Sequence, residues 1–133
     1  MSLVFADTFY FLGILNRADE AHERCRQFAA EIHGRFITTD YVVLELADGL
    51  ASPNHRLRTA RFIQQLRASS SVTIIPASER LLSRALELYE SRPDKEWSLT
   101  DCTSFVVMQE HELTEAATGD RHFEQAGFKA LLM

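Results

Sequence analysis

The sequence predicts an α/β fold, in which helices cover a central parallel sheet. Short runs of apolar or β-branched residues alternate along the chain with longer segments of helical periodicity, which is typical of this fold class. The chain has 133 residues, of which 46% are hydrophobic, so one core can form without disulfides or a structural metal. No internal repeat or long linker divides the sequence. We therefore expect a single domain over residues 1–133 with about five strands.

Each predicted element follows from its local pattern. Five short runs rich in apolar or β-branched residues are expected to be strands, at residues 3–6, 35–38, 72–75, 115–118 and 130–132. Segments with apolar residues at helical spacing are expected to be helices, at residues 8–15, 20–32, 41–50, 57–68, 79–90 and 101–111, with a last turn after Asp120. Residues 51–54 and 91–97 are expected to be loops, since each contains a turn-forming Ser, Pro and Asn or Asp.

The composition excludes several classes of protein. A formal net charge of −5 argues against a generic basic nucleic-acid binder. Cys25 and Cys102 form no CxxC pair, which excludes a zinc cluster and predicts a reduced, cytoplasmic protein. The apolar run at residues 9–15 has no basic residue before it, so we do not expect an export signal. No run approaches the roughly 20 apolar residues that cross a bilayer, and we expect no membrane role.

Three acids stand where predicted strands end and helices begin. Asp7 follows the first strand, Asp120 follows the fourth, and Asp101 opens a late helix. Functional residues of open parallel sheets gather at this carboxyl edge. The alternative for each acid is a capping role, because Asp is favoured at helix N-termini. Ser98-Leu-Thr-Asp101 is itself a capping-box pattern.

Glu45 is the one charged side chain in the apolar run from Tyr41 to Ala47. An ionised carboxylate is rarely buried unless it is paired or binds a metal. The alternative is that one face of this helix is exposed to solvent and carries both Glu45 and Asp48.

The four acids Asp7, Glu45, Asp101 and Asp120 could converge on one pocket. Two carboxylates about 4 Å apart repel by roughly 4 kcal/mol at an effective dielectric constant near 20, so a cluster would recruit a cation. Oxygen ligands favour hard ions such as Mg²⁺ or Mn²⁺ over zinc. Such sites activate water and neutralise phosphoryl oxygens.

Four segments carry a resemblance to a known family. They are Val4-Phe-Ala-Asp7-Thr8, Thr38-Thr-Asp-Tyr-Val-Val-Leu-Glu45, Trp97-Ser-Leu-Thr-Asp101-Cys-Thr-Ser-Phe105 and Thr118-Gly-Asp120-Arg-His-Phe-Glu-Gln-Ala-Gly-Phe128. In this order, over nearly the whole chain, they make the sequence similar to a PIN-domain ribonuclease of the VapC toxin type.

The resemblance implies an α/β/α sandwich that hydrolyses RNA phosphodiester bonds. Asp7, Glu45, Asp101 and Asp120 would be the catalytic acids and would bind Mg²⁺ or Mn²⁺. A metal-activated water would attack in line and leave a 5′-phosphate and a 3′-hydroxyl. Behind these acids the resemblance implies four supporting residues, Thr8, Asp40, Ser98 and Thr118. The resemblance also implies that the protein is the toxin of a type II toxin–antitoxin pair, that it binds an antitoxin, and that it forms a homodimer.

Basic residues are needed to hold the RNA phosphates near a cluster of acids. From Gly49 to Ser78 the chain contains no acid, and Arg58 and Arg61 lie there on the predicted polar side of a helix. We expect these two residues and Arg121 to bind RNA, with His122 as a further candidate for phosphate contact. The alternative is an ordinary solvated helix face.

Two other classes of protein share part of this pattern. A phosphotransferase of the haloacid-dehalogenase type would need a second Asp at the position of Phe9. A catalytically inert PIN-like module would bind RNA or a protein without cutting. The intact set of acids favours the nuclease, and metal-dependent turnover distinguishes the two.

Overall fold

A computed structural model of the protein describes residues 3–32 and 34–133. Within these residues, five parallel strands form one sheet in the order β3-β2-β1-β4-β5. The strands are β1 (Leu3–Ala6), β2 (Arg35–Thr39), β3 (Val72–Ile75), β4 (Glu115–Ala117) and β5 (Lys129–Ala130). The predicted fold class is therefore confirmed.

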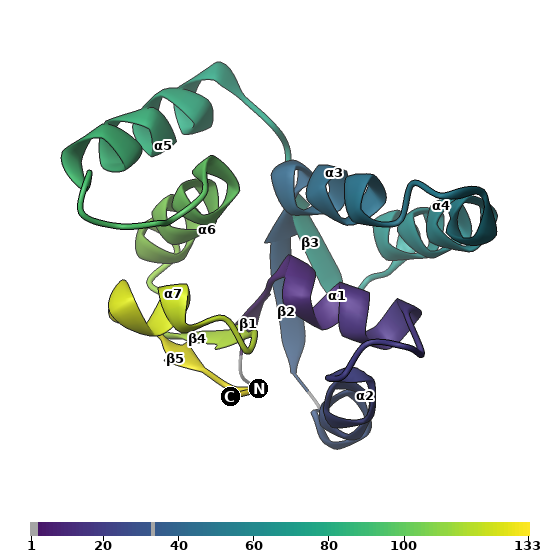
Figure 1. The fold of residues 1–133 in the computed structure, drawn as a ribbon. Coiled ribbons are helices and arrows are strands. Elements are labelled where there is room, and N and C mark those ends of the chain that lie inside the picture. The colour runs from purple at the N-terminus through teal and green to yellow at the C-terminus, as the bar shows by residue number, and fades with distance from the viewer. Residues whose placement is uncertain (1–2, 33) are drawn as a thin grey trace.

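The helices cover both faces of the sheet. They are α1 (Thr8–Leu15), α2 (His22–Glu31), α3 (Asp40–Gly49), α4 (Pro53–Ala68), α5 (Glu79–Ser91), α6 (Leu99–Glu110) and α7 (Arg121–Gln125). Figure 1 shows α1 and α2 on one side of the sheet and α5 and α6 on the other. None of the helices in the described residues is long and apolar enough to cross a membrane.

The central strand β1 lies in the middle of the core. Val4, Phe5 and Ala6 are fully buried, as expected for a parallel strand with helices on both faces. On one side of the sheet the Phe105 ring packs edge to face on Trp97 and Phe123, with centroid distances of 5.1 and 5.0 Å. This packing fixes α6 and α7 relative to the sheet.

Several element ends differ from the predicted ones. Helix α4 begins at Pro53 instead of residue 57, so half of the predicted loop at 51–54 is helical; proline suits the first helical position, where no N–H is needed. Helix α6 begins at Leu99, because Ser98 caps it. The last strand is Lys129–Ala130 instead of 130–132. Even so, the N–H groups of Leu131 and Leu132 still donate to carbonyls of residues 116 and 118.

Candidate metal centre

The structure brings the four predicted acids to one hollow of about 380 Å³ at the carboxyl edge of the sheet. Asp7 follows β1, Glu45 lies in α3, Asp101 lies in the first turn of α6 and Asp120 precedes α7. Thr8, Ser98 and His122 also line the hollow. Segments far apart in the sequence meet here because parallel strands end at one edge.

Asp7 stands at the N-cap position of α1, but its side chain makes no capping hydrogen bond. Instead, the Thr118 hydroxyl donates to its Oδ2 at 2.8 Å. Only 5% of Asp7 is exposed. Burial raises its pKa to about 7, and the negative charges of Asp101 and Glu45 add to the rise. No positively charged group of the described residues therefore lowers the pKa of the buried Asp7 carboxyl.

Asp101 both caps its helix and faces the hollow. Its Oδ2 accepts from the Ser98 N–H at 3.1 Å, while its own N–H donates to Ser98 Oγ at 2.9 Å. The predicted capping box is thus present. Burial raises the pKa of Asp101, as does the charge of Asp120, whereas hydrogen bonds from His122 and Ser98 lower it. Asp101 therefore caps α6 and lines the hollow with the same carboxylate.

Asp120 is held by two hydrogen bonds, one through its side chain and one through its backbone N–H. Its Oδ1 accepts from the N–H of His122 at 2.9 Å, which caps α7. Its own N–H donates to the Thr118 hydroxyl at 3.0 Å. Since that hydroxyl also donates to Asp7, Thr118 couples the positions of two acids that are far apart in the sequence.

Glu45 and Thr8 complete the lining. Glu45 is half-buried and lines the hollow. Thr8 is 5% exposed, and its hydroxyl has no hydrogen-bond partner among the described residues. A buried hydroxyl without a partner is costly, so a ligand in the hollow would satisfy it.

Asp40 does not line this hollow, contrary to the expectation that it supports a neighbouring acid. Its Oδ2 accepts from the Ala77 N–H at 2.9 Å, which ties the start of α3 to the segment after β3. The reason is position: Asp40 begins its helix on the side of the sheet where β2 pairs with β3.

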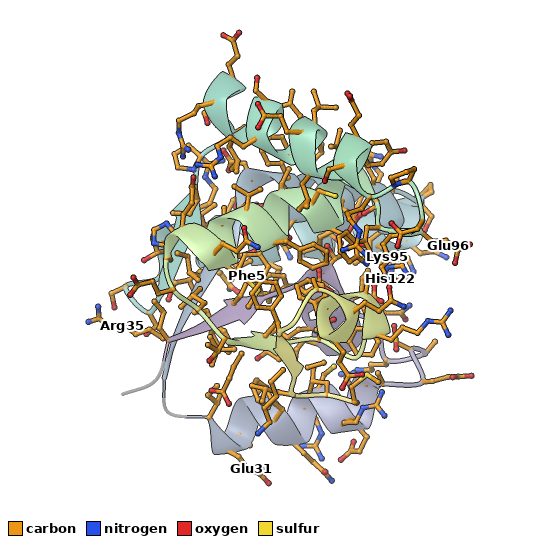
Figure 2. All side chains as sticks on the ribbon, turned by 90° about the vertical axis from the view of Figure 1, so that its left-hand side faces the viewer. Phe5, Glu31, Arg35, Lys95, Glu96 and His122 are labelled. Carbon is orange, nitrogen blue, oxygen red and sulfur yellow. The ribbon has the colours of Figure 1, made fainter. Side chains whose placement is uncertain are left out.

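Two of the polar side chains that line the hollow were not predicted as part of the site. Glu96 adds a fifth acid, and His122 brings its Nδ1 within 3.0 Å of Asp101 Oδ2 and 3.4 Å of Asp120 Oδ1. Figure 2 shows both residues at the same edge of the molecule. His122 belongs to a segment that carried the family resemblance, so a sequence signal existed. Glu96 precedes Trp97 in an expected loop, and nothing in its spacing marks it.

The donor set suits a hard divalent cation. One ligand atom each from Asp101, Asp120 and His122 lies within 4.8 Å of the others. Among the described residues, no lysine or arginine lines the hollow to balance its acids. Oxygen-rich sites of this kind bind Mg²⁺ or Mn²⁺.

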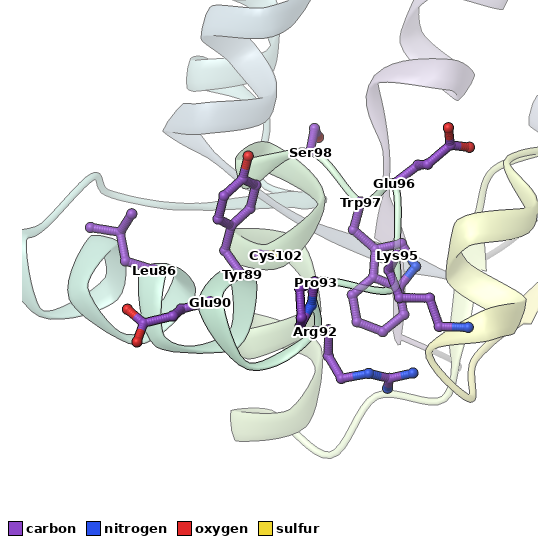
Figure 3. A pocket seen from close by; sticks show the side chains of 10 residues that line it. All are labelled: Leu86, Tyr89, Glu90, Arg92, Pro93, Lys95, Glu96, Trp97, Ser98 and Cys102. Carbon is purple, nitrogen blue, oxygen red and sulfur yellow. The ribbon is translucent and has the colours of Figure 1, made fainter.

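A larger hollow of about 770 Å³ adjoins this one and shares Glu96 and Ser98 with it. Tyr89 of α5 lines it from one side (Figure 3). On the other side, the charged groups of Arg92 and Lys95 lie 5.2 and 5.9 Å from the centre of the Trp97 ring. These two cations were not among the predicted RNA-binding residues.

The predicted RNA-binding arginines lie outside the hollow of acids. The Arg58 guanidinium donates to the carbonyl of Leu15 and joins α4 to the end of α1. Arg61 and Arg121 are exposed, and Arg121 directly follows Asp120.

The strand order and the acids gathered at the carboxyl edge are those expected of the PIN-domain family. The PIN-domain family model matches residues 4–129, and the chain belongs to the PIN-domain family. PIN domains are divalent-metal-dependent nucleases, so the predicted class of enzyme is confirmed.

The chain is similar to two proteins that have been characterised or solved. The chain is 27% identical over 128 residues to the 23S rRNA-specific endonuclease VapC20 of Mycobacterium tuberculosis, covering 95% of each chain. The crystal structure of VapC20, described as a sarcin-ricin loop cleaving toxin, matches with a TM-score of 0.86 at 26% identity over 96% of each chain. FitAcB from Neisseria gonorrhoeae matches with a TM-score of 0.68 at 19% identity, over 96% of this chain and 94% of that one. This second likeness shows the fold alone.

Proposed function

We propose that residues 1–133 act as one PIN domain that hydrolyses RNA phosphodiester bonds at a site built from Asp7, Glu45, Asp101 and Asp120. One observation carries the proposal: four acids from separate elements line one hollow without a lysine or arginine of the described residues. Acids gathered in this way repel one another unless a cation joins them. The similarity to VapC20, named as an rRNA endonuclease, supports RNA as the substrate.

The residues have separate roles in this proposal. Mg²⁺ or Mn²⁺, when bound, neutralises the phosphoryl oxygens and lowers the pKa of the attacking water. Asp7 and Asp101, the more buried acids at 5% and 8% exposed, would hold the cation directly. Glu45 and Asp120 complete the shell or orient water.

Supporting groups keep these acids in place. Thr118 and Ser98 fix them by hydrogen bonds, and the Thr8 hydroxyl, which has no partner among the described residues, would bind a ligand in the hollow. Arg61 and Arg121 are the exposed cations that we assign to the flanking phosphates. We assign Arg58 a smaller role in RNA binding, because its guanidinium already donates a hydrogen bond to the Leu15 carbonyl.

The direct test is RNA cleavage by the wild type and by Asp101→Asn, side by side, in Mg²⁺, Mn²⁺ and EDTA. The substrates are single-stranded RNAs and a 23S rRNA fragment with the sarcin-ricin loop, on which VapC20 acts. We expect cutting that needs the metal and falls roughly 100-fold or more in the variant. Asparagine keeps a capping oxygen, so the variant should stay folded.

Other outcomes have defined meanings. No cutting by a folded, metal-bound wild type would favour the catalytically inert PIN-like module that binds RNA or a protein. Equal cutting by both proteins would exclude Asp101 from the centre.

We propose further that the protein is the toxin of a type II toxin–antitoxin pair in the cytoplasm and forms a homodimer. We place the dimer surface on α3 and α4, each of which exposes a leucine. Leu44 of α3 and Leu57 of α4 are 60% and 64% exposed, and these helices are neighbours. Light scattering of the wild type and of Leu44→Lys with Leu57→Lys tests this: a dimer that the double variant converts to a monomer supports the role of α3 and α4.

A further inference from the structure

His122 makes a contact that the proposed site does not explain. It lies in the first turn of α7, and its ring is half-buried beside the hollow of acids. Its Nδ1 is 3.0 Å from Oδ2 of Asp101, a residue on a different helix. Here Nδ1 faces carboxylates, so the phosphate contact that the sequence suggested would have to use the other ring nitrogen, Nε2.

The direction of this hydrogen bond follows from the chemistry of the two groups. An ionised carboxylate can only accept, so Nδ1–H of His122 is the donor. The same Oδ2 of Asp101 also accepts from the Ser98 N–H. No hydrogen bond from the described residues reaches the other oxygen, Oδ1. Two donors from two elements therefore fix the plane of the carboxylate and leave one oxygen for a ligand.

We propose that His122 is a positioning residue, which holds Asp101 so that its free oxygen faces the divalent cation. This inference rests on the proposed function of the acids. Hydrogen bonds to metal-binding carboxylates orient them, and the loss of such a bond costs 10–100-fold in metal affinity. His122 affects cation binding only by positioning Asp101 and does not itself contact the cation.

The neighbouring contacts allow this role to be separated from a structural one. The cap of α7 uses the backbone N–H of His122, which every substituted residue retains. The cap of α6 uses Ser98 and Asp101. Removing the imidazole therefore leaves both helix caps in place and takes away one donor to Asp101.

The test is the affinity for Mn²⁺ alone, measured by calorimetry without RNA. His122→Leu keeps the volume and removes the donor, whereas His122→Asn places an amide N–H near the position of Nδ1. We expect His122→Leu to bind Mn²⁺ 10–100-fold more weakly and His122→Asn to recover most of the affinity. His111→Leu, at an exposed histidine at the end of α6, is the matched control and should bind as the wild type does.

A spectroscopic measurement separates positioning from direct ligation. Pulsed electron paramagnetic resonance of the Mn²⁺-bound wild type detects a coordinated imidazole nitrogen. We expect no such nitrogen coupling. A coupling that disappears in His122→Leu would overturn the inference, because His122 would then be a ligand.

Two further results would also count against it. Unchanged Mn²⁺ affinity in folded His122→Leu would overturn the positioning role, and so would equal losses in His122→Leu and His122→Asn. Each of these leaves RNA cleavage by the wild type intact and the proposed function standing. A wild type that binds no divalent cation would instead remove the proposed function itself.

Discussion

Thr118 is the residue on which the geometry of the acids most depends. Its buried hydroxyl donates to Asp7 and accepts from the Asp120 N–H. One small side chain at the end of β4 thus links the first and the last of the site acids. A hydroxyl in this position is hard to replace, because a serine or threonine alone offers both a donor and an acceptor at this length.

Thr118→Val should weaken both the site and the fold. Valine has nearly the same shape, so the change removes the hydroxyl and leaves two buried groups without their partner. We expect the free energy of unfolding to fall by about 1–3 kcal/mol and the Mn²⁺ affinity to fall roughly 10-fold. Urea unfolding and calorimetry measure these, with Thr118→Ser as the control that retains most of both.

The pKa of Asp7 predicts how the stability of the metal-free protein depends on pH. The pKa is about 7 in the folded state against 3.8 as the ordinary value. The folded state therefore keeps a proton that the unfolded state releases between these pH values. The contribution of Asp7 is fully present below about pH 4 and is lost as the pH rises through 7.

Urea unfolding in EDTA at pH 5 and pH 8 checks this. The wild type should lose a few kcal/mol of stability relative to Asp7→Asn over this interval, because asparagine has no proton to lose. Parallel curves for the two proteins would contradict the assignment. Saturating Mn²⁺ should reduce the difference by stabilising the ionised carboxylate.

At the scale of the elements, Arg58 joins two helices. Its guanidinium donates to the Leu15 carbonyl at the end of α1, where a positive charge also interacts favourably with the helix dipole. We expect Arg58→Ala to lower the free energy of unfolding by about 1–2 kcal/mol. Arg61→Ala, on the same helix and exposed, should change stability by less than about 0.5 kcal/mol.

RNA binding separates the two arginines further. In the Asp101→Asn background, where we expect little cutting, Arg61→Ala should weaken RNA binding and flatten its salt dependence, because a phosphate contact releases counterions. Arg58→Ala should affect both much less. The opposite order, measured by fluorescence anisotropy at several salt concentrations, would reassign the phosphate contact to Arg58.

At the scale of the whole molecule, cation binding and folding are linked. The site brings together acids from the end of β1, from α3, from α6 and from the residue before α7, so it exists only in the folded chain. A ligand that binds only the folded state stabilises it by about 2.7 kcal/mol at 100 times its Kd. We expect Mg²⁺ or Mn²⁺ to raise the melting temperature of the wild type, EDTA to reverse the rise, and Asp101→Asn to show little change. An equal rise in both proteins would place the binding elsewhere.

The sequence predicted the order of the elements because each strand and helix has its own local pattern of apolar and polar residues. The apolar run of β1 followed by Asp7, and the Ser98–Asp101 capping box, could be recognised without any tertiary contact. The same local view could not choose between capping and metal binding for Asp101, since both use one carboxylate. In the structure they are compatible, because Oδ2 serves the cap and Oδ1 is left for a ligand.

By itself, then, the sequence determined the parallel α/β fold and the four acids that face its carboxyl edge. Only the tertiary structure decided which other residues join them. In the folded chain Asp40 accepts a hydrogen bond from Ala77, and Arg58 donates one to Leu15. Glu96 and His122 instead line the hollow with the acids. The physical reason is that strand and helix periodicity act over a few residues, whereas these contacts depend on how separate helices pack on the sheet.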